Sequence, residues 1–414
     1  MIKNYRWRIL ILLFFATTIN YIDRQVIGIL KPFIETELGW TEAGYGFIVS
    51  AFQVAYAIGL LLSGRILDKI GTKKGYSIAI LAWSTAGMLH AAARSVVSFA
   101  IVRFLLGLGQ AGNFPAAIKS VAEWFPKKER ALATGLFNLG SSIGAIITPV
   151  IVTAITLVMG WKWAFIITGS LGFIWVIFWL LFYKLPQNHP GIGKEEYDHI
   201  HSDNLPVEVH EKPMSWKEIL KHKQALAICL SRLVTDWVWW FFLFWTPAFL
   251  NLMYGVDLRG MVLPLIIIYL TAGFGGIAGG WISSWFIKSG KSIDYARKTS
   301  ILICALTVVP IITASAINNI WIVTVIIALA AAAHQGWSSN IFTIGSDIFP
   351  KNTVATLTGL SGFVGATGGA FAATFVGLVL ELTGSYMVIF SFAGSAYLIA
   401  WLILKIMIPV IKPI

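Results

Sequence analysis

The sequence predicts an all-α polytopic membrane protein of twelve transmembrane helices, arranged as two six-helix repeats. Of its 414 residues, 57% are hydrophobic and only 12% are charged, whereas soluble domains carry roughly 25% charged residues. The apolar residues recur in stretches of roughly 20, the length that crosses a ~30 Å hydrocarbon core as a helix. In addition, one segment of the first half recurs in the second half.

Twelve apolar stretches are the candidate membrane helices. The predicted spans are residues 8–31, 44–67, 76–93, 97–122, 131–158, 163–183, 224–250, 260–287, 299–316, 320–346, 354–380 and 386–408. The polar segment 184–223 reads as a solvated cytoplasmic linker with a short surface helix near residues 216–220. The linker divides the chain into an N-terminal six-helix bundle, 1–183, and a C-terminal six-helix bundle, 224–414.

The basic residues indicate how the helices are oriented. With the N-terminus inside, 23 of the 31 Lys and Arg residues fall in cytoplasmic segments and four in outer loops, which is the positive-inside bias of membrane proteins. This bias explains the net charge of +12 without a nucleic-acid partner. We expect a monomeric, multi-pass protein of the bacterial inner (plasma) membrane, in contact with the lipid bilayer and with both termini cytoplasmic.

An internal repeat relates the two halves. Residues 123–136 and 347–360, separated by an offset of 224, are identical at seven of fourteen positions. Both segments join an even-numbered helix to the next helix on the cytoplasmic side. The halves are therefore predicted to be parallel repeats, which in membrane carriers place a substrate site at mid-membrane and open it alternately to either side.

Two sets of motifs carry a family resemblance. The loop 64–75, GRILDKIGTKKG, resembles the signature loop of the major facilitator superfamily. The segments 20–24 (NYIDR) and 103–115 (RFLLGLGQAGNFP) look like its anion:cation symporter branch, and residues 113–130 look most like bacterial hexuronate (glucuronate/galacturonate) transporters. The resemblance implies the major facilitator fold and proton-coupled import of a small organic anion, a hexuronate or related sugar acid, by alternating access.

The same resemblance implies a conformational latch in the signature loop. Asp68 would face the positive N-terminal end of helix 11 and brace the cytoplasmic side closed. Gly64 and Gly71 would let the helix ends approach closely. The alternative is a basic anchoring loop alone.

Two arginines of the first half, Arg24 and Arg103, lie deep within predicted membrane helices, where an ionisable side chain is costly and requires a partner or a function. Arg24 and Arg103 each lie roughly 10 Å from the outer end of their helix at 1.5 Å per residue. Their planar guanidinium groups suit a carboxylate. The alternatives are that Arg24 pairs with Asp23 and that Arg103 extends its guanidinium to the membrane surface. The family pattern assigns Arg24 to substrate and Arg103 to binding and coupling.

Asp23 is the expected proton carrier, and a permanent ion pair is its alternative. Gln110 departs from the family pattern, because the related symporters carry a coupling glutamate there and an amide cannot titrate. Either coupling rests on Asp23 alone, or the chain is a uniporter or weakly coupled carrier, or Gln110 was introduced to trap a state. The repeat offset maps Gln110 onto His334, a second titratable candidate whose alternative is a packed core histidine.

The remaining candidate substrate contacts are polar residues within the spans: Tyr21, Tyr56, Asn113, Ser338 and Ser361. Arg232 and Asp236, spaced i,i+4, are expected to form a structural pair. We predict no enzyme activity, cofactor or metal site, because the sequence contains no HExxH, phosphate loop or nucleophile–base set. The competing functions are an anion sensor that does not transport and an uncoupled carrier of neutral sugars.

Overall fold

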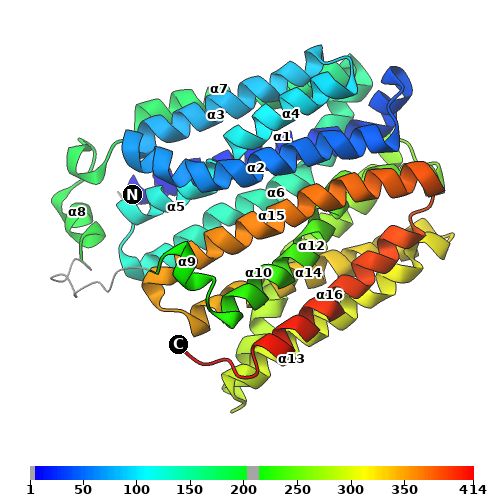
Figure 1. Ribbon diagram of the computed structural model, residues 1–414. Coiled ribbons are helices and arrows are strands. Elements are labelled where there is room, and N and C mark those ends of the chain that lie inside the picture. Colours follow the sequence, from blue (N-terminus) through cyan, green and yellow to red (C-terminus); the bar gives the residue numbers. More distant parts are fainter. Residues whose placement is uncertain (1–4, 203–213) are drawn as a thin grey trace. The chain divides into compact units, whose positions relative to one another are not determined.

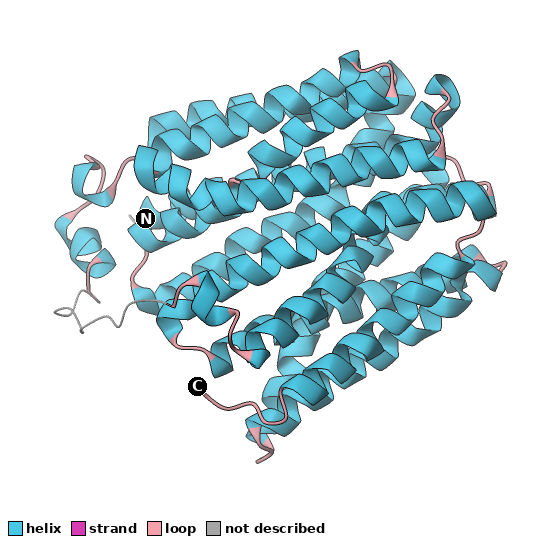
Figure 2. Ribbon diagram, viewed as in Figure 1, coloured by secondary structure: helices cyan, strands magenta, loops and turns pink. Residues whose placement is uncertain are grey.

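The computed structural model of the protein describes residues 5–202 and 214–414. Ten side chains within helices of these ranges lie outside the description: Arg65, Asp68, Lys127, Lys128, Arg130, Ala131, Leu132, Lys351, Asn352 and Ala355. All regular secondary structure in the two described ranges is helical (Figure 2). The predicted all-α class is therefore confirmed.

The helices follow one another with short connections (Figure 1). In the first half they are α1 (Tyr5–Leu38), α2 (Glu42–Ile70), α3 (Thr72–Leu89), η1 (His90–Ala92), α4 (Val96–Gln110), α5 (Asn113–Trp124), α6 (Lys127–Met159), α7 (Trp161–Phe182), η2 (Pro186–Asn188) and α8 (Lys194–Ile200). In the second half they are α9 (Trp216–Ile219), α10 (Lys223–Phe244), α11 (Thr246–Tyr254), α12 (Leu258–Lys288), α13 (Ile293–Val308), η3 (Val309–Ala316), α14 (Ile320–Ile348), α15 (Lys351–Thr383) and α16 (Met387–Met407).

These helices account for the predicted membrane spans. Eleven helical segments of the described chain are long and apolar enough to cross a membrane. The predicted span 76–93 is also helical, but α3 has only 18 residues, begins with two lysines, and is not among the eleven. The surface helix predicted near residues 216–220 is present as α9, capped by Ser215 and Glu218. The linker contains a second short helix, α8, which the sequence did not predict.

The predicted span 97–122 is divided into two helices. Helix α4 ends at Gln110 and α5 begins at Asn113. Pro115 has no backbone N–H and so cannot donate to the carbonyl of Ala111, which interrupts the helical hydrogen-bond ladder. The break places the amide side chains of Gln110 and Asn113 on either side of a turn, both buried.

The described chain packs as two compact units. Unit 1 contains the described parts of 1–26 and 58–210, and unit 2 contains 27–57 and the described parts of 211–414. Helices α1 and α2 are therefore each divided, with one part in unit 1 and the other part in unit 2. The predicted division of the chain at the 184–223 linker stays a prediction.

Within unit 1, α3 packs against α4, α5 and α7, and α6 packs against α5 and α7. The approach of α4 to α3 is close, because a Cβ at Gly109 would lie 2.7 Å from the backbone nitrogen of Trp83. Helix α6 meets α1 in the same way, since a Cβ at Gly144 would lie 2.6 Å from the carbonyl oxygen of Thr18. Small residues at such positions let membrane helices pack backbone to backbone.

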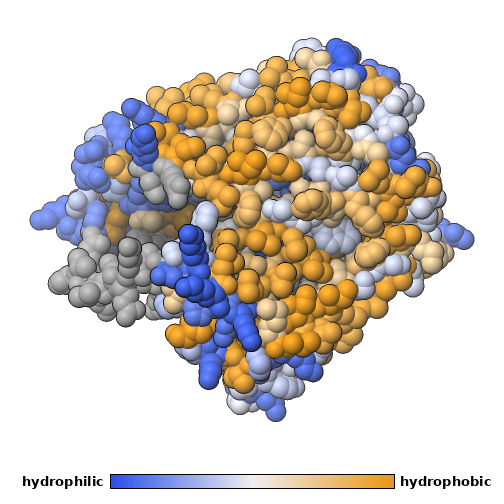
Figure 3. Space-filling view, in the orientation of Figure 1, coloured by the Kyte–Doolittle hydropathy of each residue, from blue (hydrophilic) through white to orange (hydrophobic). Residues whose placement is uncertain are grey.

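Within unit 2, α12 packs along α14, and α10 packs against α15 and α16. Large apolar side chains on both units are exposed, among them Phe274, Trp281, Phe371 and Leu382. Figure 3 shows hydrophobic residues over much of the face in view. Such a surface suits lipid rather than water. Cys229 and Cys304 are buried and free.

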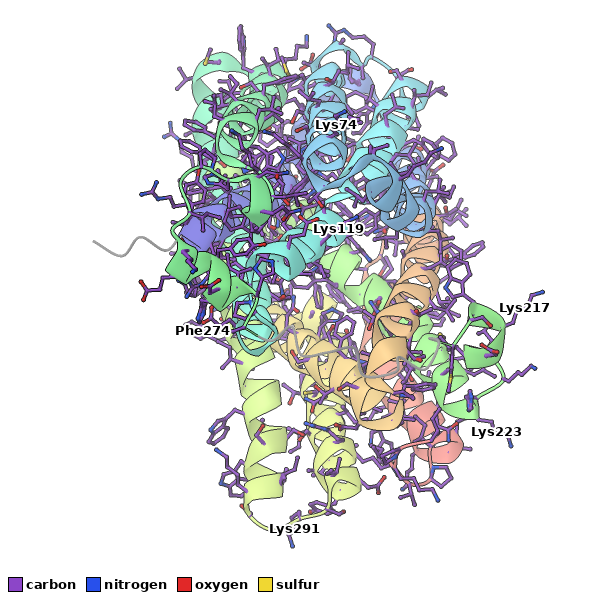
Figure 4. All side chains as sticks on the ribbon, turned by 90° about the vertical axis from the view of Figure 1, so that its left-hand side faces the viewer. Lys74, Lys119, Lys217, Lys223, Phe274 and Lys291 are labelled. Carbon is purple, nitrogen blue, oxygen red and sulfur yellow. The ribbon has the colours of Figure 1, made fainter. Side chains whose placement is uncertain are left out.

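Several basic residues of unit 2 lie at helix ends or in loops. Lys291 lies in the loop between α12 and α13, while Lys217 lies on α9 and Lys223 begins α10 (Figure 4). In unit 1, Lys74 lies in the first turn of α3, and the Nζ of Lys119 donates to the carbonyl oxygen of Leu67 at 3.1 Å. The cytoplasmic placement of these ends stays a prediction.

Candidate functional site

Helix α1 places Arg24 inside unit 1. The side chain is 2% exposed, and its Nη2 donates to the side-chain oxygen of Asn20, one turn earlier, at 3.0 Å. The guanidinium also lies over the ring of Tyr21, with 4.8 Å between Cζ and the ring centroid. The residues one turn before Arg24 thus fix the orientation of its guanidinium group.

Gln110, the last residue of α4, binds Arg24 directly. Its Oε1 accepts from Arg24 Nε at 3.0 Å, and its Nε2 donates to the backbone carbonyl of Asn20 at 2.9 Å. Gln110 stands seven residues after Arg103 on α4, and these hydrogen-bond partners are both on α1. The geometry uses one acceptor and one donor of the amide, which is the pattern that a protonated carboxyl group also offers.

Arg103 reaches α1 from seven residues earlier on α4. The side chain is fully buried, and its Nη2 donates to the backbone carbonyl of Arg24 at 2.7 Å. Its guanidinium therefore remains inside unit 1 and does not extend to the membrane surface. Arg103 thus contacts Arg24, the other arginine that the sequence singled out, through its backbone carbonyl.

Asp23, next to Arg24 on α1, is buried beside Arg103 and Thr168. It is 3% exposed, and its polar neighbours are the Thr168 hydroxyl on α7 and the Arg103 guanidinium. A Cβ at Gly87 would lie 3.9 Å from the Asp23 carboxyl carbon. Among the described residues, neither carboxylate oxygen has a hydrogen-bond partner of normal geometry. The role of this buried carboxyl group in proton coupling stays a prediction.

Asn113, at the start of α5, completes the cluster on the other side of the helix break. Its Oδ1 accepts from the Tyr76 hydroxyl at 2.7 Å, and its Nδ2 donates to the Thr17 hydroxyl at 3.3 Å. Both partners are buried. Asn113 thus ties α5 to α1 and α3 below the two arginines.

The structure adds four residues to those that the sequence singled out. Asn20 had a local signal, since it stands one helical turn before Arg24. Thr17 stands one turn earlier again. Tyr76 and Thr168 had none, because they come from α3 and α7 and meet the cluster only through tertiary packing.

The other candidate residues lie in unit 2. Tyr56 stacks on Phe52 with 5.8 Å between ring centroids and meets the edge of Trp240 at 6.1 Å. Ser361, on α15, accepts a hydrogen bond from Arg232 Nη1 at 3.1 Å. Arg232 also pairs with Asp236, with 2.8 Å between Nη2 and Oδ2, which confirms the predicted i,i+4 pair.

His334 is held within unit 2 by aromatic neighbours. Its Nδ1 lies 2.7 Å from the hydroxyl of Tyr397, and its ring stacks on Trp239 at 5.5 Å. Ser338, half-buried, follows one turn later on α14. The proton-coupling role of His334 and the substrate contact of Ser338 stay predictions.

The predicted latch falls on the junction between α2 and α3. The Asp68 side chain lies outside the described side chains. Gly71 links the two helices with a φ of +82°, a conformation that glycine adopts without strain. Gly64 lies within α2, and a Cβ there would meet nothing within 4 Å among the described residues. The roles of Asp68, Gly64 and Gly71 in a latch stay predictions.

The charges of the unit 1 cluster determine what it can bind. When ionised, Arg24, Arg103 and Asp23 carry two positive charges and one negative charge. The excess positive charge is enclosed among buried amide and hydroxyl groups. Such a cluster stabilises an anion, and a guanidinium held by neighbours is pre-organised to receive a carboxylate.

The fold and this buried charged cluster define a polytopic membrane carrier. The family model described as "Major Facilitator Superfamily" matches residues 13–373. The chain belongs to the Major Facilitator Superfamily.

Three relatives with assigned substrates are similar to this chain over most of its length. The chain is 31% identical over 412 residues to the hexuronate transporter of Escherichia coli (strain K12), covering 98% of this chain and 95% of that protein. It is 32% identical over 311 residues to the galacturonate transporter of Dickeya chrysanthemi, covering 74% of this chain and 90% of that protein. The D-galactonate transporter of Escherichia coli O6:H1 is 29% identical over 386 residues, covering 91% and 89%.

A solved structure agrees with the fold. A bacterial homologue of the human lysosomal transporter Spinster superimposes with a TM-score of 0.72, covering 97% of this chain and 95% of that chain. The two sequences are only 17% identical, so this likeness concerns the fold alone.

Proposed function

We propose that this protein is a secondary transporter that imports a small organic anion, a hexuronate or a related sugar acid, by alternating access. The observation that carries the proposal is the enclosure of Arg24 and Arg103 together in unit 1, with 2.7 Å between Arg103 Nη2 and the Arg24 carbonyl oxygen. Two guanidinium groups in a buried site favour a carboxylate-bearing substrate. The named relatives that carry sugar acids support the same substrate class.

In this proposal Arg24 binds the carboxylate, while Asn20, Tyr21 and Gln110 hold its guanidinium in place. Arg103 holds α1 by its backbone and adds positive charge. Asp23 carries the coupling proton, because its carboxyl group is buried beside Arg103 and could alternate between charged and neutral forms. Sugar hydroxyls would bind to polar side chains of unit 1 such as Asn113, while a substrate contact at Tyr56 stays a separate prediction.

The test is uptake of labelled glucuronate and galacturonate into proteoliposomes. Concentrative uptake driven by a pH gradient supports a proton-coupled importer. Uptake that only equilibrates, with or without the gradient, supports an uncoupled carrier. No uptake and no exchange, with binding retained, would support the anion sensor instead.

Competition with neutral sugar checks the charge of the substrate. We expect excess unlabelled glucose to leave glucuronate uptake unchanged, because a neutral sugar offers no charge to two buried guanidinium groups. Galacturonate should compete. Equal competition by glucose would replace the anion proposal with a facilitator of neutral sugars.

A second candidate is an uncoupled or weakly coupled carrier of the same anions. Gln110 favours it, because its two hydrogen bonds to Arg24 and Asn20 are those of a permanently protonated acid. An amide cannot release a proton, so any coupling must come from another residue, such as Asp23.

A further inference from the structure

A cavity of about 120 Å³ lies within unit 2, away from the cluster around Arg24. It is formed by the C-terminal part of α1, the first residue of α2, helix α11 and the residue before α16. Its polar lining residues are Lys31, Glu35, Thr36, Glu42, Asn251 and Tyr386. The positive-inside bias places this end of α1 on the outer side of the membrane.

The charges around the cavity do not cancel. The Lys31 ammonium is buried and lies 2.5 Å from Glu35 Oε2 and 2.6 Å from Glu42 Oε1. It also lies over the Tyr45 ring, 5.3 Å from its centroid. One ammonium neutralises one of the two carboxylates, so the lining keeps one net negative charge.

Two buried oxygen atoms around the cavity have no partner among the described residues. They are Glu42 Oε2 and the hydroxyl of Tyr386, whose side chain is 2% exposed. The Tyr386 hydroxyl interacts electrostatically with both carboxylates. The three N–H donors of Lys31 already serve two carboxylates and an aromatic ring. A buried oxygen without a donor is costly, so these atoms need a ligand.

Asn251 supplies a further oxygen. Its Nδ2 donates to the carbonyl of Val256 at 2.9 Å, which leaves its side-chain oxygen as an acceptor. The lining therefore offers carboxylate, phenol and amide oxygens, the ligand types that hard cations prefer. A single net negative charge suits a monovalent cation better than a divalent one.

We propose that this cavity is a binding site for a monovalent alkali cation, with Glu42 and Tyr386 as ligands and Lys31 limiting the charge that the site accepts. The cavity joins the outer parts of α1 and α2 to α11 and the start of α16. A bound cation would therefore stabilise the packing of these four helices within unit 2. Any influence of the cation on transport rests on the proposed function, but the binding itself does not.

The test uses the purified full-length protein without substrate and follows its thermal unfolding. NaCl, KCl and choline chloride are compared at equal ionic strength. We expect Na⁺ to raise the unfolding temperature saturably above the value in choline, because a ligand of the native state stabilises it. A rise with K⁺ as well would also support an alkali-cation site. Identical unfolding in all three salts would overturn the proposal.

Two variants separate the site from a general effect of salt. In Glu42→Gln and in Tyr386→Phe we expect the affinity for Na⁺ to fall about tenfold or more, because each removes an oxygen ligand or its charge. Tyr386→Phe deletes only a hydroxyl and leaves the Lys31 ion pairs intact. Glu37→Gln replaces an exposed carboxylate at the C-terminal end of α1. It is the matched control and should keep the full Na⁺ response.

A Na⁺ response that is undiminished in both variants would refute the site. The outcome is independent of the proposed function. Sugar-acid uptake without a Na⁺ response leaves the transporter proposal in place and removes the cation site. A Na⁺ response without sugar-acid uptake supports the cation site and removes the transporter proposal.

Discussion

At the scale of single residues, the unit 1 cluster depends on hydrogen bonds that fix one guanidinium group. Arg24 is bound by Asn20 on its own helix and by Gln110 on α4. Arg103 holds the backbone of Arg24 from the same side. A charged group that its neighbours already orient loses little further freedom when it binds a carboxylate.

Arg24→Ala is expected to abolish measurable binding of the sugar acid or to weaken it about 10- to 100-fold, because a charge-assisted hydrogen bond contributes about 1.5–3 kcal/mol. Arg24→Lys should also bind poorly, since an ammonium cannot reproduce the planar fork. Isothermal titration calorimetry with glucuronate measures both. Arg94→Ala, an exposed arginine of unit 1, is the control and should bind normally. Unchanged affinity in Arg24→Ala would remove Arg24 from the substrate site.

Gln110→Glu tests whether a glutamate at position 110 couples transport to protons. When ionised, the new carboxylate would pair with Arg24 but could not donate to the Asn20 carbonyl, and when protonated it would reproduce both present hydrogen bonds. Proton occupancy would then change how Arg24 is held, as required of a ligand that favours one state over another. We expect Gln110→Glu to gain or strengthen proton-driven accumulation in proteoliposomes.

The form with Gln110 should exchange substrate in counterflow with little response to a pH gradient. Counterflow measured on both forms is the control for folding and binding. Strong, gradient-dependent accumulation by the Gln110 form would place the coupling on Asp23 or His334 instead.

At the scale of elements, close contacts between glycine-containing helices set the positions of the spans. Helices α12 and α14 meet where Gly279 lies against Gly336, and a Cβ at Gly279 would lie 2.3 Å from the Gly336 Cα. The neighbouring Gly280 faces open space, with nothing within 4 Å of a Cβ. In lipid, such packing replaces the hydrophobic effect as the force that joins helices.

Gly279→Ala is therefore expected to destabilise the protein by about 1–3 kcal/mol, because a methyl group would collide with backbone that cannot move aside. Gly280→Ala is the matched control. It should be neutral or slightly stabilising, since alanine favours a helix over glycine by about 1 kcal/mol. Thermal unfolding in detergent compares the two. Equal stability of both variants would show that α12 and α14 do not pack as closely as Gly279 indicates.

At the scale of the whole molecule, the sequence predicts which side of the membrane each loop faces. The packing of the helices does not determine this orientation. The loop 289–292 carries Lys291, one of the basic residues expected on the cytoplasmic side. The loop 317–319, at the other end of α13 and η3, is expected outside. Both loops belong to unit 2 and contain exposed polar residues.

Single cysteines in these loops report the orientation. In right-side-out vesicles, Asn318→Cys should react with a membrane-impermeant maleimide, whereas Ser289→Cys should react only after the membrane is permeabilised. The native Cys229 and Cys304 are buried and give the background, which the unmodified protein measures. Labelling of Ser289→Cys in intact vesicles, without that of Asn318→Cys, would reverse the predicted topology.

The helical fold and eleven of the twelve predicted spans could be predicted from the sequence, because a bilayer leaves few choices. Backbone groups in hydrocarbon must bond within their own segment, and the thickness of the membrane fixes the length of each helix. The i,i+4 pair of Arg232 and Asp236 was also predictable, since helical geometry brings such residues together. The break at residues 111–112 was missed, although Gly112 and Pro115 mark it, because the apolar run continues through it.

Tertiary structure alone decided which residues surround Arg24. Nothing in the local sequence brings Gln110 to α1, because its position depends on the packing of α4 with other helices, such as the close approach to α3 at Gly109. The cavity at Glu42 and Tyr386 was equally hidden, since its ligands lie far apart in the chain. The sequence by itself determined which segments enter the membrane and which charges enter with them, since hydropathy and helical period are local. The partners of those charges depend on contacts between distant helices, which only the packed chain provides.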